Sequence, residues 1–111
     1  MRVRGWDLKA FVYILRCRDG RYYVGSTRDS LEKRVEEHNF GLFDGFTKSR
    51  RPVQLVFSQD FDRITDAIAA ERQIKGWSRA KKEAVIKGDW DLISELARNY
   101  TQFPRGSMKQ R

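Results

Sequence analysis

The sequence contains only one cysteine and one histidine among its 111 residues, and this scarcity excludes two ways of stabilising a small domain. A single cysteine, Cys17, cannot form a disulfide within the chain, and we expect it to be a buried strand residue in a reducing compartment. So few thiol and imidazole groups also leave no Cys/His cluster for a structural zinc site. A chain of this length suits one domain, which buries roughly two-thirds of the surface of its unfolded chain.

Long hydrophobic runs are also lacking. No apolar stretch approaches the roughly 20 residues that span a bilayer. Near the N-terminus, Trp6, Asp7 and Lys9 interrupt any apolar core that a secretory signal would need. We therefore expect a cytoplasmic protein without a membrane partner, in which residues 1–9 lead into the domain and Trp6 packs against it.

Negative charge is in the minority, with 15 acidic against 23 basic residues and a net charge of +8. This balance is typical of proteins that bind nucleic acid, although a merely basic, solvated surface is the simpler alternative. Basic residues cluster locally in the ranges 48–51 and 79–82. An apolar content of 40% and an aromatic content of 13% indicate a folded chain and not a disordered one.

The chain is organised around residues 11–27, FVYILRCRDGRYYVGST, which predict a β-hairpin with its turn at Asp19-Gly20. The first strand, over 10–17, is apolar on both alternating faces, so we expect it to be covered on both sides. The second strand runs over 22–26.

The length of the hairpin loop decides where Tyr13 and Tyr23 point. A two-residue loop would place them on opposite faces of the sheet. A three-residue loop, with Gly20 supplying a positive φ, would place both on one face. We predict the three-residue loop, because the chemistry inferred below needs both tyrosines on one face.

The rest of the chain predicts helices and one strand that cover this hairpin. Asp29 and Glu32 form a capping-box pattern, so a helix should run over 30–39 and place Arg34 and His38 beside its apolar seam. Glu71 lies on the apolar side of a further helix, which is unusual for a carboxylate without a partner. The other predicted elements are a loop over 40–52, a strand over 53–58, a connection over 60–65, and helices over 66–77, 78–87 and 89–99.

These elements predict an α/β fold, with a small three-stranded antiparallel sheet flanked by helices. We expect a single domain over residues 1–99, with its motifs within 10–87, and a weakly ordered tail over 100–111.

Five side chains of chemical interest should gather around one face of the sheet: Tyr13, Tyr23, Arg34, His38 and Glu71. Such a set suits phosphodiester hydrolysis. A glutamate can hold a hard divalent cation, an arginine offsets charge on phosphate, and a tyrosine near positive charge can activate water. Each residue also has a structural explanation, such as strand packing for the tyrosines or an ion pair of Glu71 with Arg72 or Lys75. The residues alone therefore leave nuclease chemistry and plain nucleic-acid binding equally open.

Five sequence blocks occur in an order that resembles the GIY-YIG nuclease superfamily. They are VYIL at 12–15, YVGST at 23–27, LEKRVEEHN at 31–39, RRPVQLVF at 50–57 and AAERQIKGW at 69–77. Within that superfamily, the chain is similar to small bacterial stand-alone proteins related to the nuclease domain of structure-specific, branched-DNA endonucleases. The first motif lacks the glycine of the family name, as is common in the branched-DNA group.

The resemblance implies an endonuclease that hydrolyses DNA with one Mg²⁺ or Mn²⁺ ion and acts in DNA repair or recombination. It implies that Glu71 binds the metal, that Tyr23 activates or positions the water, and that Tyr13 supports Tyr23. Arg34 would hold the scissile phosphate, and His38 would contact the phosphate or tune a tyrosine. Which tyrosine acts as the base varies among members and stays open.

The resemblance also implies contacts with DNA outside these five residues. Gly25 would let the backbone approach the substrate, and the expected contacts in the following loop are Thr47, Lys48, Arg50 and Arg51. The expected partner is DNA, in branched or single-stranded form, with room for a further protein partner because the tail is too short for an added DNA-binding module. A binding protein that keeps the fold without cleaving, and a role on RNA, remain as alternatives.

Overall fold

The strand β1 (Ala10–Arg16) is the centre of a three-stranded antiparallel sheet with the order β2-β1-β3. The outer strands are β2 (Tyr22–Thr27) and β3 (Gln54–Phe61). The structure is a computed structural model that describes residues 9–43 and 45–101, with the backbone alone for 97–101. The other elements are α1 (Leu31–Asn39), a 3₁₀ turn η2 (Lys48–Arg50), α2 (Ile64–Lys75), α3 (Arg79–Ile86) and α4 (Trp90–Thr101). This arrangement confirms the predicted α/β fold with three antiparallel strands flanked by helices.

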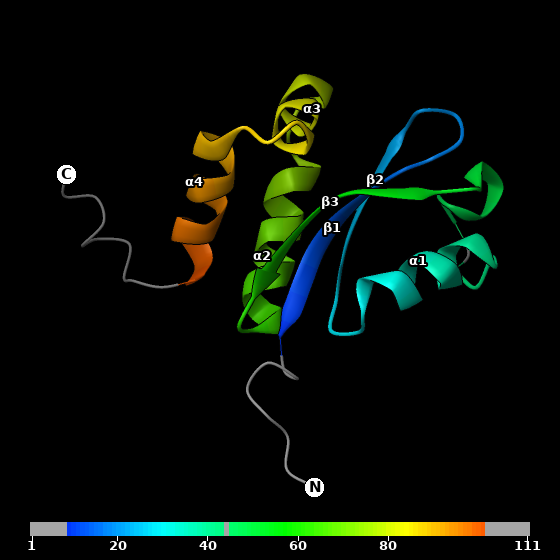
Figure 1. Cartoon of the computed structure of the whole chain (residues 1–111), viewed down its shortest axis with the longest axis horizontal. Helices are drawn as coiled ribbons and strands as arrows, with labels where there is room; N and C mark the ends of the chain where they lie inside the picture. Colours follow the sequence, from blue (N-terminus) through cyan, green and yellow to red (C-terminus); the bar gives the residue numbers. More distant parts are fainter. Residues whose placement is uncertain (1–8, 44, 102–111) are drawn as a thin grey trace, which may run out of the picture.

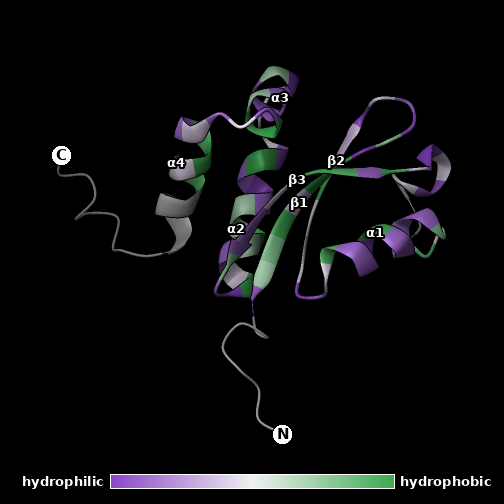
Figure 2. Cartoon of the chain, in the orientation of Figure 1, coloured by the Kyte–Doolittle hydropathy of each residue, from purple (hydrophilic) through white to green (hydrophobic). Residues whose placement is uncertain are grey.

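The helices cover the two faces of the sheet unequally. In Figure 1, α2 and α4 lie on one side of the sheet and α1 lies on the other. The larger core lies on the α2 side and includes Val12 and Ile14 of β1, which are fully buried. A smaller core on the α1 side contains Tyr13 and Leu15 with Cys17 just beyond the strand. Because successive residues of β1 enter opposite cores, the strand is apolar along most of its length, as its green colour in Figure 2 shows.

The hairpin loop has the length that the sequence analysis predicts. The backbone N–H of Cys17 donates to the carbonyl oxygen of Arg21 at 2.8 Å, which closes a loop of three residues. Gly20 occupies the third loop position with φ of +87°. Tyr13 then pairs with Gly25 across the strands, and Leu15 pairs with Tyr23. Both tyrosines therefore lie on the α1 face, which confirms the prediction.

The start of α1 differs from the predicted capping box. Ser30, and not Asp29, is the N-cap, because its hydroxyl oxygen accepts a hydrogen bond from the backbone N–H of Lys33 at 3.1 Å. The Asp29 N–H instead donates to the hydroxyl oxygen of Thr27 at 2.9 Å. The carboxylate of Asp29 is thus left for ion pairs with Lys33 and Arg34.

Other boundaries move by a few residues. The third strand is longer than predicted and continues to Phe61, which is buried in the larger core, so the first two residues of the predicted connection are strand and the last two belong to α2. Helix α2 begins and ends two residues earlier than predicted. Helix α4 ends at Thr101, so the first two residues of the predicted tail are helical. The rest of the predicted tail and Trp6 lie outside the described residues.

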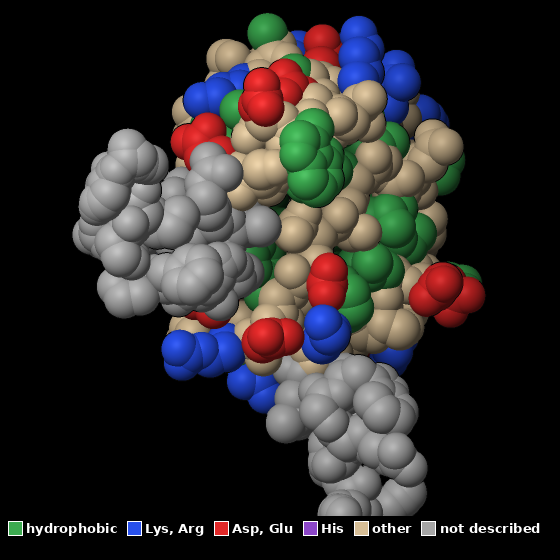
Figure 3. Space-filling model, turned by 60° about the vertical axis from the view of Figure 1, so that its left-hand side comes forward, with side chains coloured by type: hydrophobic (Ala, Val, Ile, Leu, Met, Phe, Trp, Pro, Cys, Tyr) green, Lys and Arg blue, Asp and Glu red, His purple; other side chains and the backbone are tan. Residues whose placement is uncertain are grey.

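Charge of both signs is scattered over the surface. On the face drawn in Figure 3, basic side chains gather mainly at the upper end, where α3 and the hairpin loop lie in Figure 1. Within the described part of the chain, no helix is both long and apolar enough to cross a membrane.

The hairpin loop gives a first prediction. A Cβ at Gly20 would meet no atom within 4 Å, so Gly20→Ala tests the positive φ alone. We expect it to lower the free energy of unfolding by about 1 kcal/mol, because L-residues disfavour this conformation. Urea denaturation measures the change. Gly76→Ala is the matched control, since Gly76 has φ of −84° and room for a Cβ, and it should be neutral or slightly stabilising. Equal losses in the two variants would contradict the proposed loop geometry.

Candidate active site

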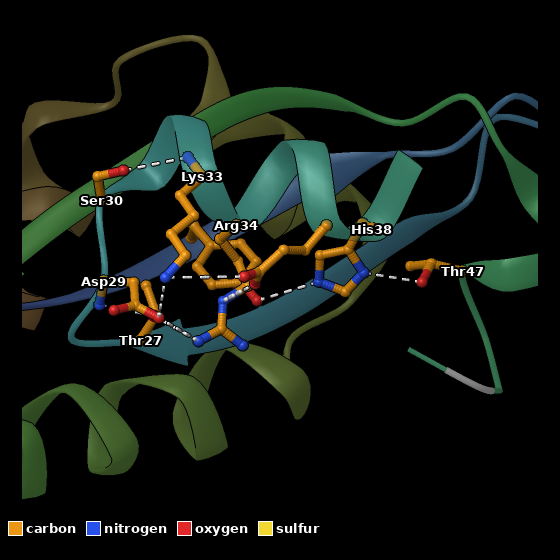
Figure 4. A network of polar contacts seen from close by, with 9 residues as sticks. Thr27, Asp29, Ser30, Lys33, Arg34, His38 and Thr47 are labelled. Atoms are coloured by element: carbon orange, nitrogen blue, oxygen red, sulfur yellow. Dashed lines mark hydrogen bonds and ion pairs between the residues drawn. The ribbon is translucent and has the colours of Figure 1, made fainter. Parts of the chain in front are cut away.

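A buried chain of hydrogen bonds links β1, α1 and the loop before η2. The hydroxyl of Tyr13 lies 3.3 Å from Nε2 of His38, and Nδ1 of His38 lies 2.8 Å from the hydroxyl oxygen of Thr47. Figure 4 shows the imidazole of His38 and its contact with Thr47. All three residues are only 2% exposed. His38 therefore contacts a tyrosine, one of the two roles that the sequence resemblance implies for it.

Aromatic rings extend this chain toward the loop. The ring of His38 lies 5.1 Å from that of Tyr23 and 4.4 Å from that of Phe43, measured between centroids. The ring of Phe46 stacks on that of Tyr23, with 6.2 Å between the centroids and 30° between the ring planes. These contacts hold both tyrosines against α1 and the loop, so the orientation of the phenol groups is set by packing.

Gly25 has a structural role in the hairpin. A Cβ at this position would lie 2.5 Å from the hydroxyl oxygen of Tyr13 and 3.1 Å from a ring carbon of Tyr23. The missing side chain thus makes room for the Tyr13 phenol that pairs across the strands, a role additional to the expected one.

Arg34 projects from α1 to the end of β2. One terminal nitrogen donates to the hydroxyl oxygen of Thr27 at 2.8 Å. The guanidinium also forms ion pairs with Asp29 at 3.4 Å and with Glu37 at 3.5 Å, and it lies over the ring of Phe43 at 5.0 Å. The side chain of Arg34 is 21% exposed, so it is mostly buried but still in contact with solvent.

Glu71 projects from α2 to the same end of β2. Its Oε1 accepts a hydrogen bond from the hydroxyl of Ser26 at 2.6 Å, and its Oε2 pairs with the ammonium of Lys75 at 2.8 Å. The carboxylate side chain is 18% exposed. The Lys75 pair is one of the structural alternatives considered from the sequence, so the unusual position of Glu71 has a structural partner as well as a possible catalytic use.

Adjacent residues of β2 hold Arg34 from α1 and Glu71 from α2, so Glu71 does not share the sheet face of the two tyrosines, as the sequence analysis expected. Thr27 points to the α1 face and holds Arg34, whereas Ser26 points to the α2 face and holds Glu71. Because β2 is an outer strand, groups from opposite faces can approach each other around its edge. The sequence analysis did not single out Ser26 and Thr27, although their alternation with Tyr23 and Gly25 in YVGST assigns them to opposite faces.

The basic residues expected to contact DNA are mostly engaged inside the protein. Arg50 donates to the Asp19 carboxylate at 3.0 Å and to the Phe46 carbonyl oxygen at 2.8 Å. Arg51 donates to the carbonyl oxygens of Lys48 at 2.8 Å and Asn39 at 3.3 Å. Both guanidinium groups thus fasten the loop to the hairpin and α1, and Arg50 also lies over the ring of Phe46 at 4.1 Å.

Burial sets the protonation states of the central pair. It raises the pKa of Tyr13 well above that of a free phenol, and the neighbouring Tyr23 adds to this effect while Arg34 opposes it. Burial also lowers the pKa of His38 to about 4, helped by the positive charge of Arg34. Near neutral pH, Tyr13 is therefore a neutral phenol and His38 a neutral imidazole.

The oxygen atoms around Glu71 fit a hard divalent cation that keeps most of its water. No group of three or more His, Cys, Asp or Glu side chains in the described ranges could hold a metal ion by itself. Mg²⁺, however, commonly takes only one or two carboxylates and completes its shell with water and substrate phosphate. The partly exposed carboxylate of Glu71 and the hydroxyl of Ser26 match that chemistry.

A known family accounts for most of the chain. The sequence model of the GIY-YIG catalytic domain matches residues 9–84. The chain belongs to the GIY-YIG family. This is a family of nuclease domains, so membership implies a nuclease-type function.

Several relatives are similar over most of their length. The UPF0213 protein SSP2268 of Staphylococcus saprophyticus is 45% identical over 70% of this chain and 94% of its own. The UPF0213 protein YazA of Bacillus subtilis is 43% identical over 69% of this chain and 77% of its own. A solution NMR structure of the UPF0213 protein BH0048 from Bacillus halodurans is 34% identical, covers 71% of this chain and 83% of its own, and has a TM-score of 0.46.

The buried imidazole predicts how stability changes with pH. His38 is the single histidine, and its pKa is lower in the folded protein than in the unfolded chain, which therefore binds more protons between about pH 4 and 6.5. Stability should fall as the pH drops through this range, by about 2 kcal/mol between pH 7 and pH 5. Urea denaturation at each pH measures the loss. His38→Gln lacks the titrating group, so it should lose much less, and an equal slope in both proteins would exclude His38 as the cause.

Proposed function

We propose that this protein is a metal-dependent endonuclease that hydrolyses phosphodiester bonds in DNA. The observation that carries the proposal is that adjacent residues of β2 hold two side chains, Thr27 holding Arg34 and Ser26 holding Glu71. A cation-binding carboxylate and a phosphate-binding guanidinium are the two groups that phosphodiester hydrolysis needs close together. A protein that only bound DNA would gain nothing from a carboxylate near phosphate.

The tyrosines supply the remaining chemistry in this proposal. Tyr23, whose ring contacts those of His38 and Phe46, would orient the attacking water and, after releasing its own phenol proton to solvent, take the proton of that water. Tyr13, kept neutral by burial, would support Tyr23 by hydrogen bonding and would not itself act as the base.

Glu71 would hold one Mg²⁺ or Mn²⁺ ion, with Ser26 orienting the carboxylate through its hydroxyl. When bound, the ion would supply positive charge that polarises the phosphate and stabilises the leaving oxygen. Lys75 would give up its pair with Glu71 or keep it through the second carboxylate oxygen.

Arg34 would bind the scissile phosphate and stabilise the charge that grows during the reaction. In the protein without DNA, Asp29 and Glu37 neutralise this arginine. Their exchange for phosphate keeps the guanidinium paired at every stage, so it is never left as a buried, uncompensated charge.

The proposal extends to the substrate and the cellular setting. The net charge of +8 supports a nucleic acid as the partner. The similarity of the motifs to branched-DNA endonucleases supports branched or single-stranded DNA as the substrate and repair or recombination in the cytoplasm as the setting.

Cleavage assays with a charge-removing variant test the proposal. A labelled panel of single strand, duplex, flap, splayed arm and four-way junction is incubated with Mg²⁺, with Mn²⁺ and with chelator. We expect metal-dependent cleavage of at least one substrate, and Glu71→Gln should reduce its rate by about 10²-fold or more, since the carboxylate is the metal ligand.

Glu83→Gln is the matched control for this variant. Glu83 likewise accepts a hydrogen bond from a β2 hydroxyl, that of Tyr22 at 3.2 Å, and pairs with a cation four residues away, Arg79 at 3.0 Å. It should leave cleavage nearly unchanged. Binding without cleavage of any substrate under every metal condition would refute the nuclease and favour a DNA-binding protein that keeps the fold.

A second variant separates binding from turnover. Arg34→Ala should lower turnover by about 10²- to 10³-fold, because the guanidinium acts on charge that develops in the transition state. The dissociation constant for DNA should rise only a few-fold. Arg72→Ala is the control, since Arg72 is the exposed arginine that directly follows Glu71 in α2. Single-turnover kinetics and equilibrium binding measure the two effects, and a loss of affinity with unchanged turnover would disprove this role for Arg34.

A further inference from the structure

Thr47 stands where a threonine usually caps a helix, but its hydroxyl does not do so. It is the N-cap residue of η2, and its side chain makes no capping hydrogen bond. Its backbone carbonyl oxygen accepts the closing bond of this turn from the N–H of Arg50 at 3.0 Å. The hydroxyl is instead turned inward to Nδ1 of His38, where both residues are 2% exposed. The turn therefore needs the backbone of residue 47, while the hydroxyl serves the imidazole.

A neutral imidazole carries one N–H and one bare nitrogen, so the chain Tyr13–His38–Thr47 can run in only two directions. In the first, the phenol of Tyr13 donates to Nε2, and Nδ1–H donates to Thr47. In the second, Thr47 donates to Nδ1, and Nε2–H donates to the phenol oxygen.

Acid and base strengths decide between these directions. A phenol is a much stronger acid than an aliphatic hydroxyl, and an imidazole nitrogen is a stronger base than either oxygen. The best donor and the best acceptor are therefore paired when the phenol of Tyr13 donates to Nε2. In this direction the proton of the imidazole is on Nδ1, and the hydroxyl oxygen of Thr47 accepts the hydrogen bond from Nδ1–H.

We propose that Thr47 is a positioning residue that fixes His38 as the Nδ1–H tautomer, so that Nε2 accepts the hydrogen bond of Tyr13. The ring cannot turn to escape this arrangement, since Phe43 and Tyr23 pack against it at 4.4 and 5.1 Å.

The catalytic consequence rests on the proposed nuclease function. With its proton directed to Nε2, the Tyr13 oxygen presents lone pairs and no proton to its surroundings. It can therefore accept a hydrogen bond from Tyr23 or from a water molecule, whose proton must leave during attack on phosphate. In the opposite direction Nε2–H would occupy one lone pair of Tyr13 and the phenol would direct its proton to its surroundings, so it would act there mainly as a donor.

The single histidine makes the tautomer directly measurable, with no need for activity. Long-range ¹H–¹⁵N NMR spectra of the full chain distinguish a protonated from a bare ring nitrogen. We expect Nδ1 of the wild-type protein to carry the proton. In Thr47→Val, which keeps the shape of the side chain but removes the acceptor, we expect most of the population to shift to Nε2–H. Thr47→Ser should restore Nδ1–H, and the exposed Thr65→Val should leave the spectrum unchanged.

Several results would overturn the proposal. A wild-type spectrum with the proton on Nε2 refutes it without any variant, so a Thr47→Val protein that failed to fold would not remove the test. An unchanged tautomer in a folded Thr47→Val would refute it equally.

A kinetic arm tests the positioning role and separates it from the proposed function. On the best substrate of the cleavage panel, Thr47→Val should lower turnover by about 10- to 100-fold with little change in DNA affinity, as loss of a residue that orients an active-site histidine typically does. Thr47→Ser should recover most of this loss. A shifted tautomer with unchanged turnover would refute the catalytic part. Absence of cleavage by the wild-type protein would refute the nuclease function, while the spectra would still decide the tautomer.

Discussion

The bond from the Cys17 N–H to the Arg21 carbonyl oxygen closes a three-residue loop, and the register set by this loop is the constraint on which the site depends. In that register Tyr13 lies across from Gly25 and can extend its phenol over the missing side chain. A shift by one residue would send Tyr23 to the other face, because side chains alternate along a strand. The hydrogen bond of Tyr13 with His38 on α1 exists only because both tyrosines face that helix.

Much of this could be predicted from the sequence where a local rule applies. Two short apolar runs around Asp19-Gly20 identified the hairpin, and helical spacing placed Arg34 and His38 beside the apolar seam. The register was chosen between two loop lengths only because the inferred chemistry needs both tyrosines on one face. Glu71 was recognised as a carboxylate on an apolar helix face. In each case the signal lies within one element and follows from the geometry of a strand or a helix.

What escaped prediction depends on partners that are distant in the sequence. Thr47 could not be assigned to His38, nine residues earlier, because loop geometry decides which hydroxyl reaches the ring. Arg50 and Arg51 could be read from the sequence only as charge, whereas the structure uses them to fasten a loop to backbone carbonyls. The choice of Ser30 over Asp29 as the helix cap also depended on a competitor, since Arg34 and Lys33 pair with the aspartate.

The outer position of β2 lets side chains from two helices bind its adjacent residues, but in the described part of the chain it also leaves the backbone groups along one side of the strand unpaired. Within the described ranges no strand pairs with the outer side of β2, and an unpaired edge is a template for a second copy of the chain. A proline or a covering segment there would close the approach to Arg34 and Glu71. Mutual repulsion from the net charge of +8 keeps such edges apart. A polyanion bound to the chain would weaken that repulsion, and the unpaired edge of β2 would then be less protected from pairing with a second copy.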